Sequence, residues 1–350
     1  MSPVELSPEA IAAADPSNMV GDVLAQPEQL RDAVWRAESA GLPHRHAPGG
    51  LVVAGMGGSA VGGDLAAAIL GARAAGPVRT VRGYDLEPWV GPDTLVLCAS
   101  YSGDTEETLV CFEAAGAAGA PRAVVTTGGQ LGAAAREAGV PVIGAPAGFQ
   151  PRAAVAYMTV AALEAAAACA AGPSLRAELE AAAALLGDLV REWGPDAPPG
   201  SEAKALAAAI AGSLPVVYGA GRTAAVARRW KTQLNENANT AAFASELPEA
   251  DHNEVCGYEA DAASSARPAA VFLDDDGLDE RLRRRIALTA QLVEPGAALV
   301  RRVEARGQTP AERVLSLVLL GDLASVYLAV LTGVDPTPVP AIDRLKRLLG

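Results

Sequence analysis

The sequence predicts an α/β protein of two halves, each a doubly wound parallel sheet flanked by helices. Three observations lead to this class: a length of 350 residues, short apolar runs that alternate with longer helical patterns, and a central stretch rich in Pro and Gly. A chain of this length exceeds a typical single domain, so two domains of roughly 150 residues each are expected. Half of the residues are hydrophobic, which is ample for two cores.

The first half alternates strands and helices. Buried strands are expected from apolar runs at 51–55, 94–100, 122–127 and 140–144, with a weaker strand at 79–83. Helical patterns lie between them at 59–72, 105–118 and 130–138, and two long ones follow, one after Pro151 to about 171 and one over 174–193. Such alternation predicts a parallel sheet covered on both faces.

The second half repeats this build after a linker. The stretch "GPDAPPGSE", residues 194–202, predicts a boundary between a first subdomain, 1–193, with an N-terminal helical extension, and a second, 203–350. Strands are expected at 214–220, 269–275 and 297–305. Helices are expected at 222–237, 277–292, 309–332 and from about 340.

Charge and cysteine content restrict the partners and the compartment. The net charge of -13 argues against a nucleic-acid or anionic-membrane surface, because clustered Lys and Arg hold those partners. Cys98, Cys111, Cys169 and Cys256 lack paired metal-ligand spacing and are expected to be reduced thiols. We find neither a basic apolar leader nor an uninterrupted apolar run of membrane-spanning length, so we expect a cytoplasmic protein.

A glycine-rich turn, "GMGGSAVGGDL" from Gly55 to Leu65, follows the first strand and opens a helix. It matches the loose dinucleotide pattern Gly-x-Gly-x-x-Gly/Ala, in which glycines let the backbone approach a pyrophosphate. A dinucleotide fold also places an acidic residue at the end of its second strand, where this chain has Arg82 and Gly83. We therefore expect a small-anion or sugar site, with a plain strand-to-helix turn as the structural alternative.

A second loop, "ASYSGDTEETL" from Ala99 to Leu109, carries Ser100, Ser102 and Thr105 into the start of a helix. Unpaired N–H groups and the positive end of the helix dipole attract phosphate to such a terminus. Ordinary helix capping is the alternative, but one hydroxyl is enough for a cap. Three hydroxyls without any Lys predict recognition of a compact monophosphate.

Together these loops resemble the sugar isomerase (SIS) domain, a flavodoxin-like fold whose Ser/Thr-rich loop holds the phosphate of a phosphosugar. A polar stretch further on, "NENANTAAFASELPEADHNEV" (235–255), resembles the active-site segment of the bifunctional phosphoglucose/phosphomannose isomerases. The segments "FQPRAAVAY" (149–157) and "GVDPTPVPAIDRLKRLL" (333–349) also match that family. The four motifs occur in the family's order and span nearly the whole chain.

The resemblance implies roles for four residues. Glu236 would be the catalytic base and His252 would assist ring opening, while Arg152 and Lys346 lie in the other two matched segments. Aldose–ketose isomerisation moves a proton between C2 and C1 through an enediol, so it needs one carboxylate that reaches both carbons. Cations stabilise the enediolate oxygens, and an imidazole titrates in the range that ring opening requires.

The resemblance also implies a substrate-binding set and an assembly. Gly57, Gly58 and Ser59 would approach the sugar, while the hydroxyls of the second loop would hold the phosphate. In the family two subunits pair, and the histidine serves the neighbouring site. The polar segment 238–256, with little apolar periodicity, is expected to be an extended arm rather than a core helix.

Structural alternatives exist for each of these residues. Arg152 could belong to an ion pair, and Lys346 could lie along the surface of the last helix. The acidic residues after Glu236 could be surface charges or partners of the cations on the preceding helix, Arg228, Arg229 and Lys231. The family's phosphate loop more often has Asn where this chain has Asp104, which we expect to face solvent. "HRH" at 44–46 could mimic a metal site, but a solvated turn is favoured.

We therefore predict an isomerase that interconverts glucose 6-phosphate or mannose 6-phosphate with fructose 6-phosphate, as a homodimer with active sites at the interface. No metal or organic cofactor is implied. The alternative from another class is a catalytically silent phosphosugar-binding regulator, since SIS modules also occur in regulators. A nicotinamide oxidoreductase ranks third.

Overall fold

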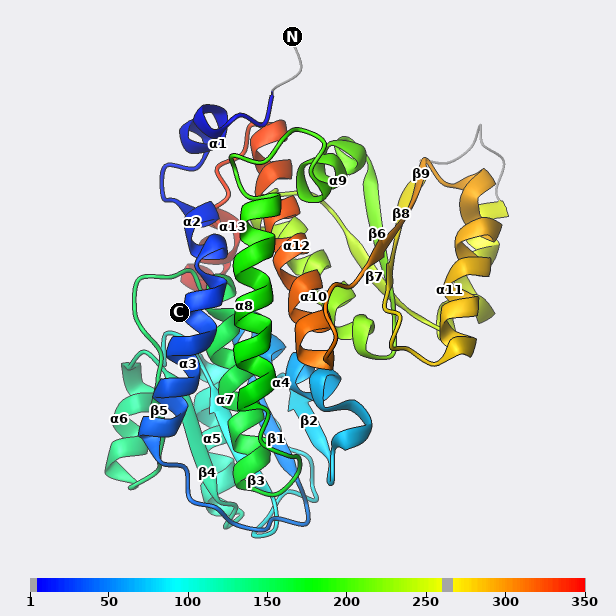
Figure 1. Ribbon diagram of the computed structural model, residues 1–350. Coiled ribbons are helices and arrows are strands. Elements are labelled where there is room, and N and C mark those ends of the chain that lie inside the picture. Colours follow the sequence, from blue (N-terminus) through cyan, green and yellow to red (C-terminus); the bar gives the residue numbers. More distant parts are fainter. Residues whose placement is uncertain (1–4, 260–266, 350) are drawn as a thin grey trace. The chain divides into compact units, whose positions relative to one another are not determined.

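The computed structural model describes residues 5–259 and 267–349 (Figure 1). The chain divides into two compact units. The first-sheet unit comprises Ala25–Ala184 and Thr309–Glu312, and the second-sheet unit comprises Met1–Leu24, Leu185–Gln308 and Arg313–Gly350. Each unit contains one parallel sheet flanked by helices, so the predicted fold class is confirmed.

The sheet of the first-sheet unit has five parallel strands in the order β2-β1-β3-β4-β5. Their bounds are β1 Leu51–Gly55, β2 Val78–Val81, β3 Leu95–Ala99, β4 Arg122–Thr126 and β5 Val142–Gly144. Strands β1 and β3 consist almost wholly of buried aliphatic residues, as strands covered on both faces do. This is the flavodoxin-like order, in which the chain turns in opposite directions from β1 and β3.

Helices cover both faces of this sheet (Figure 1). On one face lie α3 Gln26–Ala40, α4 Gly57–Leu70 and α7 Val155–Ala168, and on the other α5 Glu106–Ala117 and α6 Gly129–Glu137. Helices α4 and α7 pack closely because Gly62 faces Met158, where a Cβ would lie 2.4 Å from the Met158 carbonyl carbon. Short 3-10 turns, η1 Gly71–Arg73 and η2 Pro151–Ala154, complete the unit, and the long helix α8 Arg176–Trp193 follows.

The sheet of the second-sheet unit has four parallel strands in the order β7-β6-β8-β9. Their bounds are β6 Leu214–Ala220, β7 Phe243–Leu247, β8 Pro268–Asp274 and β9 Leu299–Glu304. Three of these strands match the sequence expectation, but β7 does not. The expectation of an extended arm over 238–256 is wrong in part, because the segment forms this edge strand and two 3-10 turns, η3 Glu249–His252 and η4 Glu254–Glu259.

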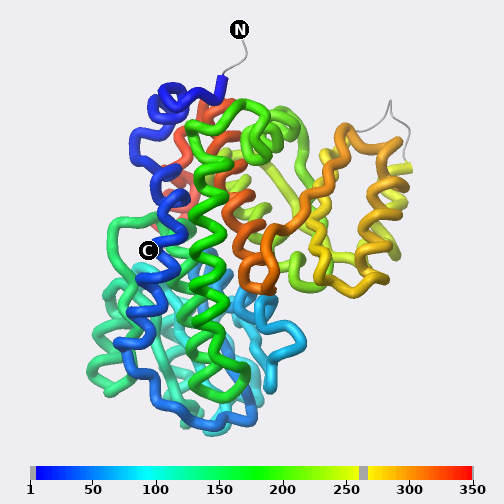
Figure 2. Tube along the Cα trace, in the orientation of Figure 1, coloured from blue at the N-terminus to red at the C-terminus, as the bar shows by residue number. Residues whose placement is uncertain are grey.

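One long helix lies against each face of this sheet, and another long helix packs on the first of them. Helices α10 Arg222–Asn237 and α12 Pro310–Thr332 are joined by the Trp230 indole, which donates to the Leu317 carbonyl at 2.8 Å and covers Gly321. Helix α11 Glu280–Val293 packs on β8 and β9. Figure 2 shows the path of the chain through the strands and helices of this unit. Among the described residues, α12 is long and apolar enough to cross a membrane, but 94% of its apolar window is buried as core.

The predicted linker is folded onto a helix that the sequence analysis did not anticipate, α9 Glu202–Ile210. The buried Lys204 ammonium donates to three carbonyl oxygens, those of Leu6, Pro195 and Ala197, at 2.6–2.8 Å. Three carbonyls satisfy its three donors, which explains how this cation is tolerated inside the unit. The remaining helices are α1 Pro8–Ala14, α2 Met19–Leu24, η5 Glu294–Gly296 and α13 Pro340–Leu349.

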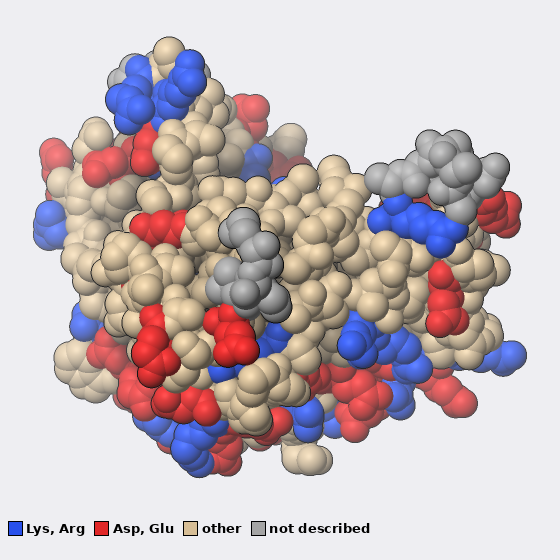
Figure 3. Space-filling view, turned by 90° about the horizontal axis from the view of Figure 1, so that it is seen from above, with Lys and Arg blue, Asp and Glu red and all other residues tan. Residues whose placement is uncertain are grey.

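Charged side chains of both signs are interspersed on the molecular surface. On the face shown in Figure 3, acidic and basic groups are scattered among uncharged ones. Several of the surface cations are paired, for example Arg82 with Asp64 at 2.5 Å and Arg285 with Asp251 at 3.0 Å. Of the four thiols, Cys98, Cys111 and Cys169 are buried and Cys256 is exposed, and none forms a disulfide.

Candidate functional site

The two predicted ligand loops meet at the carboxyl ends of two neighbouring strands of the first sheet. Strand β1 leads directly into the glycine-rich start of α4, and its neighbour β3 leads into the Ser/Thr-rich loop before α5. The carboxyl ends of two strands whose connections diverge form the crevice where doubly wound sheets bind ligands. A hydrogen bond joins the loops, because the Tyr101 amide donates to the Ser59 hydroxyl at 3.0 Å.

The hydroxyls of the second loop have different surroundings. Ser100 is fully buried; its hydroxyl pairs with that of Thr105 at 2.8 Å and accepts from the Gly103 amide at 3.1 Å. Ser102 is exposed and its hydroxyl accepts from the Asp104 amide at 3.2 Å. Ser100 therefore shapes the loop from inside, while Ser102 presents its hydroxyl to solvent.

The first turn of α5 decides between capping and ligand binding. Thr105 occupies the N-cap position, yet within the described residues its side chain makes no capping hydrogen bond to α5. Its hydroxyl is directed to Ser100 instead. The capping alternative is therefore not supported, and the first amides of α5 stay uncapped by Thr105. Unpaired amides at a helix N-terminus are the groups that bind phosphate.

Asp104 points away from that helix terminus. The residue is exposed, as expected, and its carboxylate accepts from the Gln130 amide in the first turn of α6 at 3.0 Å. A carboxylate is favourable at that position because the N-terminus of α6 carries partial positive charge. The hydrogen bond with α6 explains why an acidic residue, Asp104, is tolerated in the loop that is predicted to bind phosphate.

Arg152 lies at the same edge of the sheet. It belongs to η2, and its side chain is 2% exposed, with a contact of 3.5 Å to the Gln150 amide oxygen. The backbone of η2 lies against the first turn of α4, since a Cβ on Gly58 would stand 2.9 Å from the Pro151 oxygen. Glycine is therefore required at 58 for a close approach. The structure thus brings together Arg152 and the predicted binding residues, Gly57, Gly58, Ser59, Ser100, Ser102 and Thr105.

Glu236 belongs to the second-sheet unit, in the last turn of α10, and is partly exposed. Its neighbour Asn237 is fully buried and donates to the Ser325 hydroxyl of α12 at 2.8 Å. Two turns earlier, Arg229 makes a buried double contact with Asp322 at 2.6 and 3.0 Å. These bonds fix the rotation of α10 about its axis. The Arg229–Asp322 pair was not predicted from the sequence, which offered the acids after Glu236 as candidate partners of this cation.

His252 is exposed at the end of η3, just beyond β7. The turn packs on α11, where Asp251 accepts from the Thr289 hydroxyl at 2.6 Å and pairs with Arg285. The end of β7 lies beside the end of β6, where α10 begins. Helix α10 then runs back along the sheet for 16 residues, about 24 Å, before it reaches Glu236. His252 therefore lies at the carboxyl ends of the strands of the second sheet, and Glu236 of the same chain lies toward their amino ends.

Lys346 is exposed on α13. The helix presents apolar side chains to solvent as well: Ile342 is 39% exposed, Leu345 57% and Leu348 75%. Lys346 flanks this apolar stripe, since it follows Ile342 by four residues on the helix.

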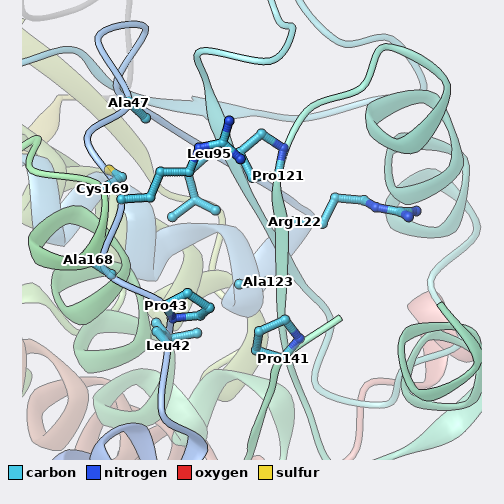
Figure 4. A pocket seen from close by; sticks show the side chains of 11 residues that line it. Leu42, Pro43, Ala47, Leu95, Pro121, Arg122, Ala123, Pro141, Ala168 and Cys169 are labelled. Carbon is cyan, nitrogen blue, oxygen red and sulfur yellow. The ribbon is translucent and has the colours of Figure 1, made fainter. Parts of the chain in front are cut away.

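Other candidate features lie apart from the ligand edge. A cavity of about 140 Å³ opens near the amino ends of β3 and β4, lined by apolar groups such as Leu95 and Pro121 (Figure 4). The Arg122 guanidinium points away from it, over the Phe112 ring. His44 and His46 are exposed in a turn, as expected, and the described residues contain no group of three His, Cys, Asp or Glu that could hold a metal.

Comparison with known proteins shows to which family the chain belongs. It is 36% identical over 302 residues to the bifunctional phosphoglucose/phosphomannose isomerase of Caldicellulosiruptor bescii, covering 86% of this chain and 89% of that protein. A protein of the same name from Aquifex aeolicus is 36% identical over 303 residues, covering 86% and 90%. This chain belongs to the bifunctional phosphoglucose/phosphomannose isomerase family.

Further matches agree with this family and its fold. Residues 200–349 match the model of the bacterial phospho-glucose isomerase C-terminal SIS domain. A hypothetical protein from Thermus thermophilus superposes with a TM-score of 0.73 at 18% identity, covering 97% of this chain and 93% of that one. A glucose-6-phosphate isomerase like protein from the same organism gives a TM-score of 0.64 at 19% identity, covering 98% and 99%. At these identities the two structures show the SIS fold alone.

Sequence reasoning gave no role to Tyr101, although the residue lies inside the quoted loop. Its hydroxyl donates to the Pro146 carbonyl and accepts from the Phe149 amide, both at 2.9 Å. A buried aromatic residue between two serines of a ligand loop was the available signal, but its partners lie more than 40 residues further along the chain.

Proposed function

We propose that this member of the isomerase family interconverts glucose 6-phosphate or mannose 6-phosphate with fructose 6-phosphate. The observation that supports the proposal is the start of α5 after strand β3, where the Thr105 side chain does not cap the helix and Ser102 is exposed beside it. The names of the relatives supply the two aldose substrates. A monophosphate fits a site of a few amides and hydroxyls, because the loop from Ala99 to Leu109 contains no Lys for a longer phosphate chain.

In this proposal the phosphate anchors the sugar and a carboxylate moves the proton. Glu236 removes the C2 proton of the open-chain aldose and returns it to C1, while a proton passes from the C2 hydroxyl to the carbonyl oxygen. Arg152 and Lys346 stabilise the negative charge that develops on the enediolate oxygens. Gly57, Gly58 and Ser59 approach the sugar. Every step uses side chains of the protein itself.

We further propose a homodimer in which His252 of the partner subunit opens the sugar ring for each Glu236. The separation of the two residues within one chain supports this assignment, because one hexose phosphate cannot span about 24 Å of helix. The exposed apolar stripe of α13 supports burial against another subunit, since contiguous exposed apolar side chains mark interaction surfaces. We assign the enzyme to the cytoplasm, where free thiols such as Cys98 stay reduced.

A coupled assay that offers each hexose 6-phosphate separately tests the activity. Fructose 6-phosphate should yield both glucose 6-phosphate and mannose 6-phosphate, and neither reaction should need added metal or nicotinamide. In a thermal-shift experiment in the same buffer, fructose 6-phosphate should raise the melting temperature and NAD should not. Binding of phosphosugar without any turnover would favour the silent regulator, and stabilisation by NAD alone would favour the oxidoreductase.

A further inference from the structure

Tyr101 lies between two of the loop serines, but its side chain turns inward. The residue is 8% exposed, and its hydroxyl bridges the Pro146 carbonyl and the Phe149 amide at 2.9 Å each. The Pro146 carbonyl and the Phe149 amide belong to the first and fourth residues of a turn. In an ordinary β-turn these two groups form a hydrogen bond with each other. Here the tyrosine hydroxyl stands between them, so the turn 146–149 is held by a side chain of the phosphate loop.

The backbone of Tyr101 ties the loop to two more segments. Its amide donates to the Ser59 hydroxyl at the start of α4, and its carbonyl accepts from both the amide and the hydroxyl of Thr127 at 2.9 Å. One residue therefore joins the segments that follow β1 and β4 to the loop that follows β3. Movement of any one segment would strain the others.

The turn 146–149 leads straight into Arg152. The Ala153 amide bonds the Gln150 carbonyl at 2.8 Å, which begins η2 directly after the turn. The backbone of Pro151 and Arg152 itself rests against Gly58. Arg152 is thus located between two fixed points, the first turn of α4 and the turn that Tyr101 holds.

We propose that Tyr101 is a positioning residue that couples the phosphate loop to Arg152. Through its hydroxyl it sets the turn from which Arg152 extends, so that phosphate binding and placement of the guanidinium occur in one preformed arrangement. The inference rests on the proposed isomerase function for the role of Arg152, whereas the tether itself is independent of it.

Tyr101→Phe removes the hydroxyl and keeps the ring. The Pro146 carbonyl and the Phe149 amide then lose their shared partner, and the turn is free to close on itself or take up water. We expect kcat/KM to fall about tenfold, the usual size of one lost buried hydrogen bond. The loss should lie mostly in kcat, because Ser102 and the α5 amides still hold the phosphate.

A double-mutant cycle with Arg152→Ala distinguishes positioning from general destabilisation. If Tyr101 acts through Arg152, then Tyr101→Phe should have little further effect in the Arg152→Ala background. Tyr327→Phe is the matched control, since this buried tyrosine also donates to a carbonyl, that of Trp193 at 2.8 Å, within the second-sheet unit. It should lower stability to a similar extent and leave kcat/KM unchanged, both in the wild-type background and in the Arg152→Ala background.

Hydrogen exchange tests the tether without relying on activity. The Phe149 amide should lose protection in Tyr101→Phe and keep it in Tyr327→Phe. An unchanged Phe149 amide, or a tenfold loss of kcat/KM that persists in the Arg152→Ala background, would overturn the inference. An inactive wild-type enzyme would instead overturn the proposed function, while the exchange experiment would still decide whether Tyr101 holds the turn.

Discussion

The two sheets have the same connections around their central strands, but the residues at the carboxyl ends of these strands differ: hydroxyls in the first sheet and carboxylates in the second. In the first-sheet unit, β3 is followed by hydroxyls and by a helix start that Thr105 does not cap. In the second-sheet unit, the corresponding strand β8 ends at Asp274 and is followed by Asp275 and Asp276. Asp275 is buried, with its carboxylate 3.3 Å from Arg222 at the start of α10 and 3.6 Å from Arg313.

The second crevice therefore contains an anion that belongs to the protein. Asp274 is similarly enclosed, with Arg302 at 2.6 Å and Arg283 at 3.4 Å. A parallel sheet with diverging connections creates a place for negative charge beside a helix N-terminus, whichever residues follow the strand. The residues that follow the strand therefore decide whether a ligand or a side chain can fill this place, and we expect phosphate to bind at the first sheet alone.

The largest effect is expected at the proposed catalytic base of the second-sheet unit, Glu236. Glu236→Gln keeps size and hydrogen bonding but removes the base, so kcat should fall roughly a hundredfold or more while phosphosugar affinity survives. Glu246→Gln, at an exposed position of β7, is the control and should stay near wild type. Steady-state kinetics with fructose 6-phosphate measures both variants. Near-normal turnover of Glu236→Gln would remove that residue from the mechanism.

Sharing of sites between subunits can be tested by mixing inactive chains. Under conditions of subunit exchange, Glu236→Gln and His252→Ala chains should form hybrids with one complete site each, which restores roughly a quarter of wild-type activity. Each variant exchanged with itself is the control and should stay inactive. Verified hybrids without recovered activity would place Glu236 and His252 in the same site of one chain.

The internal anion of the second sheet should matter for stability. Asp275→Asn leaves Arg222 and Arg313 without their buried countercharge, and breaking a buried pair costs about 3–5 kcal/mol. Urea unfolding should show this loss, while the Kd for fructose 6-phosphate stays unchanged in the folded enzyme. Asp279→Asn, at the exposed N-cap of α11, is a control with a smaller expected loss. A weakened phosphosugar Kd in Asp275→Asn would mean that the second crevice takes part in binding.

The hydroxyls of the first sheet should matter for binding. Ser102→Ala and Thr105→Ala should each weaken phosphosugar affinity by about 1–3 kcal/mol, the size of one lost charge-assisted bond. Competition by inorganic phosphate should weaken in parallel, because the lost contact is to the phosphate. Ser245→Ala, on the edge strand β7, serves as a hydroxyl deletion away from the first sheet. Unaltered affinity in both loop variants would refute the phosphate site.

The smallest effect is expected from the one acid in the first loop. Asp104→Asn keeps an oxygen that can accept from the Gln130 amide, and the charge it removes is exposed and screened. Affinity for fructose 6-phosphate should rise by less than about threefold at physiological salt. A tenfold gain would show that Asp104 faces the ligand after all.

Local patterns allowed much of the fold to be predicted, and long-range pairs limited the rest. The bounds of β1, β6 and α10 were predicted to the residue, because each apolar run or helical pattern ends at or next to a Gly or Asn. Strand β7 was missed since most of its residues are exposed, which leaves no apolar run to detect. The candidate phosphate loop was predicted because its residues are contiguous in the sequence. The Asp275 pairs and the Tyr101 tether were not, because their partners are distant in the chain.

Calorimetric titration of the wild-type enzyme with fructose 6-phosphate tests the difference between the two sheets most directly. We expect one bound phosphosugar per chain, loss of that binding in the Ser102→Ala/Thr105→Ala double variant, and its retention in Asp275→Asn. Two bound molecules per chain, or a binding isotherm that survives the double variant and disappears with Asp275→Asn, would contradict it.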